Sequence, residues 1–198
     1  MNENEAAVKW RCLRATPFGP VATLWSVHRG APKIVRVLLS APGAPAERAR
    51  PRLFPGARAG SCREIDAIAD RFEAFLNGED IAFSLDLVRL DLCPPFQQRV
   101  LRAEHGVPRG RVTNYSLLAT RAGSPRGARV AGTALATNPF PLVIPCPRAV
   151  RSDGALGGYQ GGLEMKRALL EMEGVRFRDR KHVAGREFHY GGDGRSIP

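Results

Sequence analysis

The sequence has few cysteines, and none of them lies in a pattern that binds a metal or forms a redox pair. The four stand far apart, at Cys12, Cys62, Cys93 and Cys146. No CxxC pair occurs, and the four histidines add no spacing typical of a zinc site. We therefore expect no metal, and no disulfide framework, which the reducing cytoplasm disfavours. A zinc site assembled from scattered residues such as Cys12 and His28 stays open.

Long hydrophobic runs are also missing. No apolar stretch approaches the roughly 20 residues of a membrane-spanning helix. The first residues, MNENEAAVKWRC, lack the apolar core of a signal peptide. The composition, with 43% hydrophobic and 25% charged residues, is ordinary for a globular chain, and the 198 residues allow one domain or two small ones. We expect a cytoplasmic protein with no membrane partner.

Negative charge is scarce in the C-terminal half. The chain has 30 Lys and Arg residues against 19 Asp and Glu, a net charge of +11. Residues 97–198 carry +9 of this excess and residues 1–96 carry +2. Such a basic half is typical of a protein that binds a polyanion, and nucleic acid is the first candidate. Solubility alone would explain the same excess, so composition leaves both interpretations open.

Residues 1–93 have the pattern of a β-rich domain with one helix. Two β-rich runs occupy 20–40 around a turn at 30–32, and the segment 41–62, rich in Pro, Gly and Ala, is predicted to be a loop. Helical spacing of apolar residues predicts a helix over 64–78. Alternation at Phe83, Leu85 and Leu87 predicts a strand. The prolines at 94 and 95 mark the expected domain boundary.

Residues 94–178 have a helical pattern instead. One helix is predicted over 95–107, and two short helices over 116–123 and 125–137 are separated by a Gly-Ser turn, which is the outline of a helix-turn-helix. The last of these helices is rich in Gly and Ala, so a partner can approach its backbone closely; packing against another helix explains the same pattern. The basic, glycine-rich residues 179–198 are expected to form a solvated tail.

Cys146 stands between two prolines, at the end of an apolar run and before a glycine-rich loop. The prolines restrict the backbone and present the thiol in one direction. A thiol acts as a nucleophile only as the thiolate, which needs a positive or hydrogen-bonding environment such as Arg148 could help to provide. The glycines that follow permit a tight loop around a flat ligand. A purely structural cysteine is the alternative.

Residues 95–174 resemble the C-terminal domain of the O6-alkylguanine-DNA alkyltransferases, the methylated-DNA–protein-cysteine methyltransferases. The matching segments occur in family order: PFQQRVL, VPRGRVTNYSLLA, GSPRGARVAGTALATNP, IPCPR and GALGGYQGGLEMKRALLEMEG. The resemblance implies an α+β fold. A small N-terminal sheet-and-helix domain, ribonuclease-H-like in the family (1–93), precedes a mostly helical C-terminal domain with a winged-helix-like helix-turn-helix (94–178) and the tail (179–198).

The implied activity is DNA repair. A monomer in the cytoplasm, associated with the nucleoid, would bind the minor groove of double-stranded DNA and flip out a damaged base. It would transfer an alkyl group from O6 of guanine irreversibly to its own cysteine, with O4 of thymine left open as a second source. The resemblance implies no metal or organic cofactor, and each molecule would react once.

The resemblance also assigns roles to individual residues. Cys146 is the nucleophile, Glu173 polarises the hydrogen-bond relay, Tyr115 helps to rotate the nucleotide and Asn138 braces the active-site turn. Arg129 would replace the extruded base in the duplex. The residues expected to contact DNA are Arg129, Arg126, Tyr115, Ala128, Gly132 and Arg148, and those expected to line the guanine pocket are Pro145, Val150, Tyr159, Gln160 and Gly161.

One position departs from the family pattern. The usual motif is Pro-Cys-His-Arg, and here Pro147 replaces the histidine that takes up the thiol proton. Proline offers neither a base nor an N–H, and general-base assistance contributes about 10²–10⁴ in rate. Two alternatives to alkyl transfer therefore stay open: a non-catalytic, alkyltransferase-like protein that binds the lesion, and a helix-turn-helix DNA binder without transfer. Gln160, where a small Ser is common, predicts a different range of alkyl groups.

Overall fold

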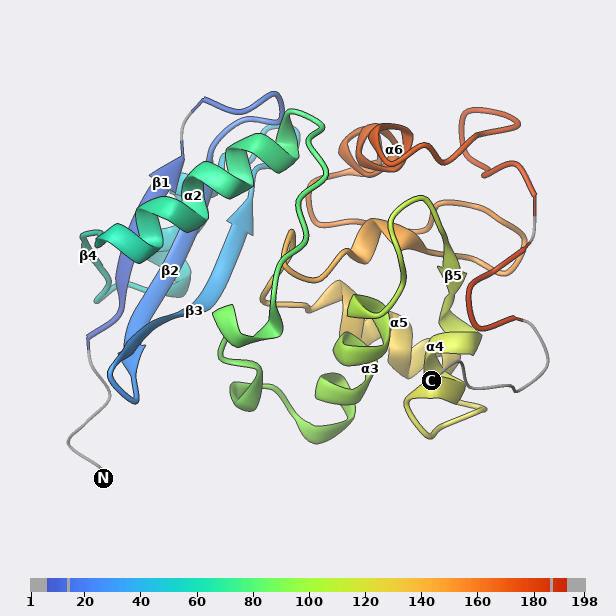
Figure 1. Cartoon of the computed structure of the whole chain (residues 1–198), viewed down its shortest axis with the longest axis horizontal. Coiled ribbons are helices and arrows are strands. Elements are labelled where there is room, and N and C mark those ends of the chain that lie inside the picture. Colours follow the sequence, from blue (N-terminus) through green and yellow to red (C-terminus); the bar gives the residue numbers. More distant parts are fainter. Residues whose placement is uncertain (1–6, 14, 186, 192–198) are drawn as a thin grey trace. The chain divides into compact units, whose positions relative to one another are not determined.

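The computed structural model describes residues 7–13, 15–185 and 187–191, which divide into two compact units. The first contains residues up to Leu92 together with Pro139–Val143, and the second contains Cys93–Asn138 and the residues from Ile144 onward. Figure 1 shows a sheet-and-helix unit and a mostly helical unit along the chain. No helix in the described ranges is both long and apolar enough to span a membrane.

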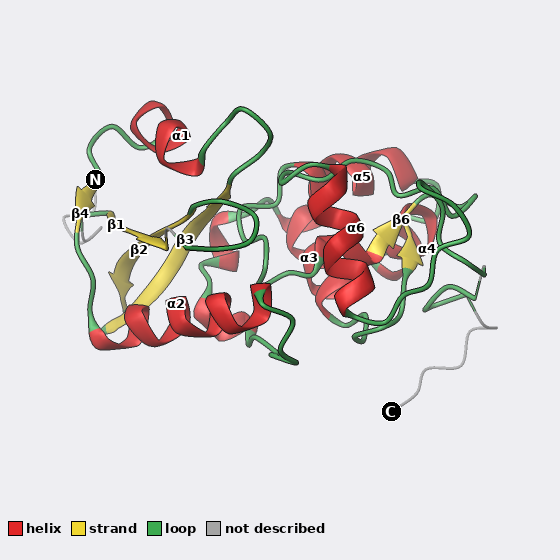
Figure 2. Ribbon diagram, turned by 90° about the horizontal axis from the view of Figure 1, so that it is seen from above, coloured by secondary structure: helices red, strands yellow, loops and turns green. Residues whose placement is uncertain are grey.

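The first unit is built on a four-stranded sheet of order β3-β2-β1-β4. β1 (Lys9–Leu13), β2 (Val21–His28) and β3 (Ala31–Leu39) are antiparallel neighbours, and the short β4 (Arg58–Ala59) pairs parallel with β1. Figure 2 shows α1 (Ala46–Leu53) on one face of the sheet and α2 (Arg63–Leu76) on the other. Because both faces are covered, residues 21–26 of β2 are all buried.

The predicted helix over 64–78 corresponds to α2, whose apolar stripe is buried. Phe72 and Phe75 pack against Phe83, with ring centroids 5.1 Å and 5.8 Å apart. Gly78 follows the helix with φ of +99°, a backbone conformation that glycine adopts without steric cost.

Two predictions for the first unit were wrong. The segment 41–62 is not only a loop, because it contains α1 and β4. The N–H of Ala46 donates to Ser40 Oγ at 3.0 Å and Ala46 is fully buried. A hydrogen bond to a residue before the helix therefore starts a helix that local composition disfavours. The predicted strand within 81–92 is also absent, apart from a single bridge between Val88 and Ile34. That region forms 3₁₀ turns at Leu85–Leu87 and Leu90–Leu92, the first capped by Ser84, whose hydroxyl accepts from the Asp86 N–H.

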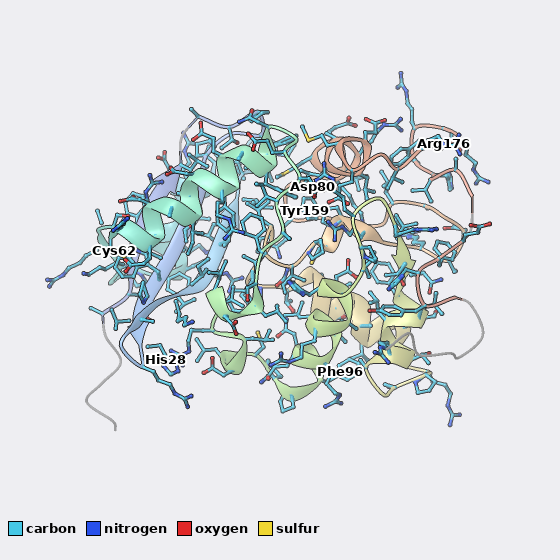
Figure 3. All side chains as sticks on the ribbon, viewed as in Figure 1. His28, Cys62, Asp80, Phe96, Tyr159 and Arg176 are labelled. Atoms are coloured by element: carbon cyan, nitrogen blue, oxygen red, sulfur yellow. The ribbon has the colours of Figure 1, made fainter. Side chains whose placement is uncertain are left out.

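The second unit packs α3 (Pro95–His105), α4 (Tyr115–Arg121) and α5 (Ala128–Ala136) against one another. A two-stranded parallel sheet joins β5 (Thr113–Asn114), which runs into α4, to β6 (Ala149–Val150). The Asn114 side chain caps α4 by accepting from the Leu117 N–H at 3.0 Å. α6 (Leu163–Met172) completes the unit. Figure 3 labels Phe96 of α3 and Tyr159 in the loop before α6.

The described part of the C-terminal segment is anchored to the second unit, which corrects the expectation of a wholly solvated tail, although many of its side chains are exposed. Val183 is 3% exposed and belongs to a core cluster with Val112, Val150, Leu156 and Leu170. The His189 N–H donates to the Val112 carbonyl at 2.7 Å, and Phe188 packs on the same cluster. Apolar residues spaced through a basic segment therefore attach it to β5 and β6. Arg186 and residues 192–198 lie outside the described ranges.

Candidate active site

Cys146 opens a 3₁₀ turn, Cys146–Arg148, that leads directly into β6. The turn closes where the Arg148 N–H donates to the Pro145 carbonyl at 2.9 Å, and the Cys146 N–H donates to the Ile144 carbonyl at 2.8 Å. Pro147 is the second residue of the turn, where a backbone N–H has no partner within the turn. The proline therefore fits the local structure without losing a hydrogen bond. It removes only the side chain that the family's histidine would supply.

The thiol of Cys146 is buried and receives one hydrogen bond. Asn138, which is fully buried just after α5, donates from Nδ2 to Cys146 Sγ at 3.0 Å. Gln160 Nε2 in turn donates to the Asn138 carbonyl at 2.7 Å, so the loop before α6 helps to hold the asparagine. Burial and the charge of Glu104 raise the pKa of the Cys146 thiol to about 12, although the Asn138 donor opposes that shift. The Cys146 thiol therefore stays protonated at neutral pH.

Arg148 and Glu173 form an ion pair inside the second unit. Arg148 Nε donates to Glu173 Oε2 at 2.8 Å and Nη2 to Oε1 at 2.9 Å, which is a bidentate arrangement. Arg148 Nη1 also donates to the Val107 carbonyl at 2.6 Å. The two side chains are 12% and 3% exposed. This placement does not fit the predicted contact between Arg148 and DNA, since the guanidinium is directed into the protein.

Lys166 is a fully buried cation on α6 that the sequence interpretation missed. Its Nζ donates to the carbonyls of Ala149 at 2.7 Å, of Leu156, and of Gly158 at 3.4 Å. Burial lowers its pKa to about 8, while the three acceptors match the three N–H bonds of an ammonium group. Lys166 thus ties α6 both to the residue that follows the cysteine turn and to the glycine loop.

Glu104 on α3 is the second charged group that the sequence interpretation missed. It is 0% exposed, and neither carboxylate oxygen has a hydrogen-bond partner of good geometry. Burial raises its pKa from the ordinary 4.5 to about 8, while Lys166, Arg148 and the nearby Ala149 N–H oppose the rise. A signal was available, because Glu104 follows Val100 by four residues and Leu101 by three and therefore lies on the apolar face of its helix. Lys166 precedes Leu169 by three residues and Leu170 by four, so it too lies on the apolar face of its helix.

Tyr115 is the first residue of α4, and two glycines lie against its side chain. A Cβ atom on Gly157 would lie 2.6 Å from the Tyr115 hydroxyl, and one on Gly132 of α5 would lie 3.9 Å from its ring. The glycine loop and the small face of α5 therefore both leave room for this ring. Burial and the charges of Glu104 and Cys146 raise the pKa of Tyr115, so its hydroxyl stays protonated and can donate a hydrogen bond.

The predicted pocket residues do not all lie together. Tyr159 has a buried hydroxyl without a hydrogen-bond partner, and burial with the nearby charges of Cys146 and Glu173 raises its pKa well above the usual range. Gly161 is buried close to Tyr159 and to Met165, and Pro145 precedes the cysteine turn. Val150, by contrast, is fully buried in the core cluster with Val112 and Leu156. Val150 therefore belongs to the hydrophobic core, and its contact with the guanine stays a prediction.

The remaining predicted residues lie on the surface around α5. Arg126 and Arg129 are exposed, and Val130 beside them is 57% exposed. A hollow of about 320 Å³ lies next to them, lined by Tyr115, Ser116, Ala128, Arg129, Arg151, Ser152 and Asp153. Sequence reasoning missed Arg151, which adds a further cation to this surface. The described residues hold no group of three His, Cys, Asp or Glu side chains suited to a metal.

Comparison with known proteins places this chain in a family. The family model described as 6-O-methylguanine DNA methyltransferase, DNA binding domain, matches residues 95–175. The methylated-DNA–protein-cysteine methyltransferase of Methanothermobacter thermautotrophicus is 51% identical over 112 residues, which cover 56% of this chain and 62% of the relative. The Mycobacterium leprae protein of the same name is 38% identical over 124 residues, which cover 61% of this chain and 73% of the relative.

Solved structures of proteins from the same family are also similar to this chain. Mycobacterium tuberculosis OGT in complex with DNA aligns with a TM-score of 0.67 and 28% identity over 84% of this chain and 93% of that one. The O6-methylguanine-DNA methyltransferase of Pyrococcus kodakaraensis aligns with a TM-score of 0.61 and 25% identity over 85% and 99%. The sheet-and-helix unit followed by a helical unit is thus the fold of these enzymes, which confirms the predicted fold class. The chain belongs to the methylated-DNA–protein-cysteine methyltransferase family, as its sequence segments predicted.

Proposed function

We propose that this protein repairs DNA by transferring an alkyl group from O6 of guanine to Cys146. The observation that carries the proposal is the position of the thiol. Cys146 Sγ lies 3.0 Å from Nδ2 of Asn138. Asn138 follows α5, which exposes Arg129, and Arg126 is exposed in the turn just before this helix. An amide donor at the sulfur stabilises a developing thiolate, and the helix supplies a surface suited to DNA.

DNA binding would use the small face of α5. The minor groove is only about 6 Å wide, so a helix with Ala128 and Gly132 on its surface can enter where larger side chains would clash. Arg129 would take the place of the extruded nucleotide, and Tyr115 would help to rotate that nucleotide out of the stack. Arg126 and Arg151 lie nearby and would contact phosphates.

The chemistry is a single displacement. Cys146 Sγ attacks the alkyl carbon on O6, the C–O6 bond breaks, and its electrons remain on the guanine oxygen, which takes up a proton. The alkyl group stays on sulfur as a thioether, so each molecule reacts once. Tyr159 and Gly161 would wall the guanine, while Gln160 would act by bracing Asn138 through the bond it already makes. Alkyl groups on O4 of thymine are a second candidate substrate for the same displacement.

One observation favours a second candidate function. The pKa of the Cys146 thiol is about 12 and Pro147 supplies no base, so recognition of the lesion without transfer is the alternative. Intact-protein mass spectrometry distinguishes the two after incubation with excess duplex that contains O6-methylguanine. A gain of one methylene group that is absent from Cys146→Ala supports transfer. Selective binding of the lesion duplex with no mass gain would identify a lesion-binding protein, and equal binding of damaged and intact duplex would contradict both.

A further inference from the structure

The last described residues of the chain, 187–191, form a strap that is hydrogen-bonded to the segment leading into α4. The His189 N–H donates to the Val112 carbonyl at 2.7 Å, and the His189 carbonyl accepts from Thr113 Oγ1 at 2.8 Å. Thr113 is fully buried, so its hydroxyl has no access to water as a substitute partner. Two successive residues before α4 are therefore held by one residue of the strap.

Tyr190 anchors this strap on α3. Its hydroxyl donates to the Ala103 carbonyl at 2.9 Å. That carbonyl belongs to the last turn of α3, where the helix leaves its carbonyls without partners of its own. The guanidinium of Arg121, the last residue of α4, lies over the Tyr190 ring at 5.6 Å from the ring centroid. One side chain therefore joins the strap to the ends of both helices.

Gly106, which follows α3, leaves the space that the Tyr190 hydroxyl occupies. A Cβ atom on this glycine would lie 2.8 Å from the hydroxyl oxygen and 3.5 Å from the Ala103 carbonyl oxygen. The backbone does not require glycine here, because φ of −75° and ψ of −5° are right-handed values that most residues adopt. Tyr190 itself has φ of +67°, a strained conformation that persists only where the surroundings hold the residue. The end of α3 and the strap are therefore fitted to each other.

The segment that the strap holds leads directly to a residue of the candidate site. β5 runs into α4, whose first residue is Tyr115, and the Asn114 side chain caps that helix. The Tyr115 side chain lines the hollow beside Arg129, with its hydroxyl close to Gly157. The position of the ring in this hollow therefore depends on the backbone of β5, which the strap holds.

We propose that Tyr190 is a positioning residue, which docks the strap and thereby holds Tyr115 in the orientation that rotates the damaged nucleotide out of the duplex. The inference rests on the proposed function for the role of Tyr115, while every contact that carries it lies within the protein. Loss of the anchor frees the strap, so the start of α4 becomes mobile and the Tyr115 ring no longer keeps one orientation. The hydrogen bond from Asn138 to Cys146 comes from other elements, so the thiol keeps its environment.

The first test is single-turnover transfer from a duplex that contains O6-methylguanine, with the protein in increasing excess, so that the limiting rate and the half-saturating concentration are obtained separately. Tyr190→Phe removes only the hydroxyl. We expect its limiting rate to fall about tenfold, while the half-saturating concentration and the alkylation of Cys146 by iodoacetamide stay within about twofold. A strap that serves stability alone would leave the limiting rate unchanged well below the melting temperature. Phe177→Leu, which weakens the packing against the nearby core cluster, is the control for lost stability and keeps the limiting rate.

Gly106→Ala tests the same contact from the side of α3. The added methyl group displaces the Tyr190 hydroxyl, so we expect the same loss in limiting rate as in Tyr190→Phe. In the double variant the hydroxyl is absent, and the methyl group should cause no further loss. Two residues that act through one contact show this non-additive behaviour. Losses that add in the double variant would overturn the proposal.

Hydrogen–deuterium exchange separates this inference from the proposed function, because it needs no substrate. In Tyr190→Phe the backbone N–H groups of residues 112–118 should exchange faster than in the unmodified protein, while those of α2 in the first unit keep their rates. If the unmodified protein transfers no methyl group but exchange at 112–118 rises, the proposed function fails and the positioning of Tyr115 stands. Unchanged exchange at 112–118, or an unchanged limiting rate of transfer, overturns the role of Tyr190. Should Tyr190→Phe melt below the assay temperature, Gly106→Ala decides by the same two readouts.

Discussion

Arg148 and Glu173 face each other as a two-point ion pair, with Nε–Oε2 and Nη2–Oε1 distances of 2.8 Å and 2.9 Å. The pair joins the turn that carries Cys146 to the residue that ends α6. Glu173 therefore has a structural partner in this pair, and its place in the proton relay that the family resemblance implies stays a prediction. Arg148 likewise orients the turn from within the protein.

Breaking this pair is expected to destabilise the fold. Glu173→Gln leaves a buried guanidinium without its countercharge, so we expect a loss of about 3–5 kcal/mol in the free energy of unfolding. Urea denaturation measures it. The exposed pair of Arg167 and Glu171, whose oxygen and nitrogen lie 2.7 Å apart, provides the control, and Glu171→Gln should change stability by less than about 1 kcal/mol. Equal effects of the two variants would contradict the assigned role.

Stability is expected to fall as the pH rises toward 8. The pKa of Glu104 is raised by burial from 4.5 to about 8, so this carboxyl stabilises the fold fully below pH 4.5 and loses that contribution as the pH rises through about 8. The slope is about 1 kcal/mol per pH unit in this window. Thermal melting of the unmodified protein and of Glu104→Gln between these limits checks it. The variant should show a clearly flatter profile, and parallel profiles would mean that Glu104 titrates normally.

Binding to DNA is expected to depend on Arg129. Arg129→Ala removes an exposed cation at the start of α5 and should weaken binding to a duplex with O6-methylguanine by about tenfold or more. Fluorescence anisotropy at two salt concentrations measures the loss. Arg176→Ala, at an exposed arginine beyond α6, is the matched control. A similar small loss for both would show that Arg129 contributes charge alone and does not enter the duplex.

Pro147→His is expected to speed alkyl transfer. The change adds an imidazole next to Cys146, which supplies a proton acceptor and lowers the thiol pKa, so we expect a gain of about tenfold or more. Single-turnover transfer measures it. Pro147→Ala restores the backbone N–H without a base and should leave the rate within about twofold of the unmodified protein. An equal gain in both variants would trace the effect to turn flexibility, and no gain in either would show that the site already has a sufficient acceptor.

Sequence patterns predicted the helices whose formation depends on residues within the helix itself. The apolar spacing of α2 and the proline that starts α3 indicated those helices, and the match to family segments indicated that Asn138 and Cys146 belong to one site. α1 was missed because its start depends on Ser40, a residue outside the helix. The 3₁₀ turns at 85–92 were taken for a strand because short alternating runs fit both structures.

The charged interior could not be predicted in the same way. Glu104 and Lys166 are far apart in sequence, and only the packing of α3 and α6 around the cysteine turn makes them neighbours. Each lay on an apolar helix face, which marks a buried charge but does not identify its partner. Arg148 was predicted as a DNA contact from the family resemblance, while its partner in the structure, Glu173, comes from another element.

The attachment of the C-terminal segment sets a minimum length for an active fragment. A chain cut after Arg178 would retain every residue assigned to catalysis or to DNA. It would nevertheless lose Val183 and the bond from the His189 N–H to the Val112 carbonyl. Val112 precedes β5 and Val150 is the last residue of β6, the two short strands that join the cysteine turn to the start of α4. Truncation there would remove part of the hydrophobic core that contains Val112 and Val150. A minimal fragment that keeps this core therefore has to extend at least through Tyr190.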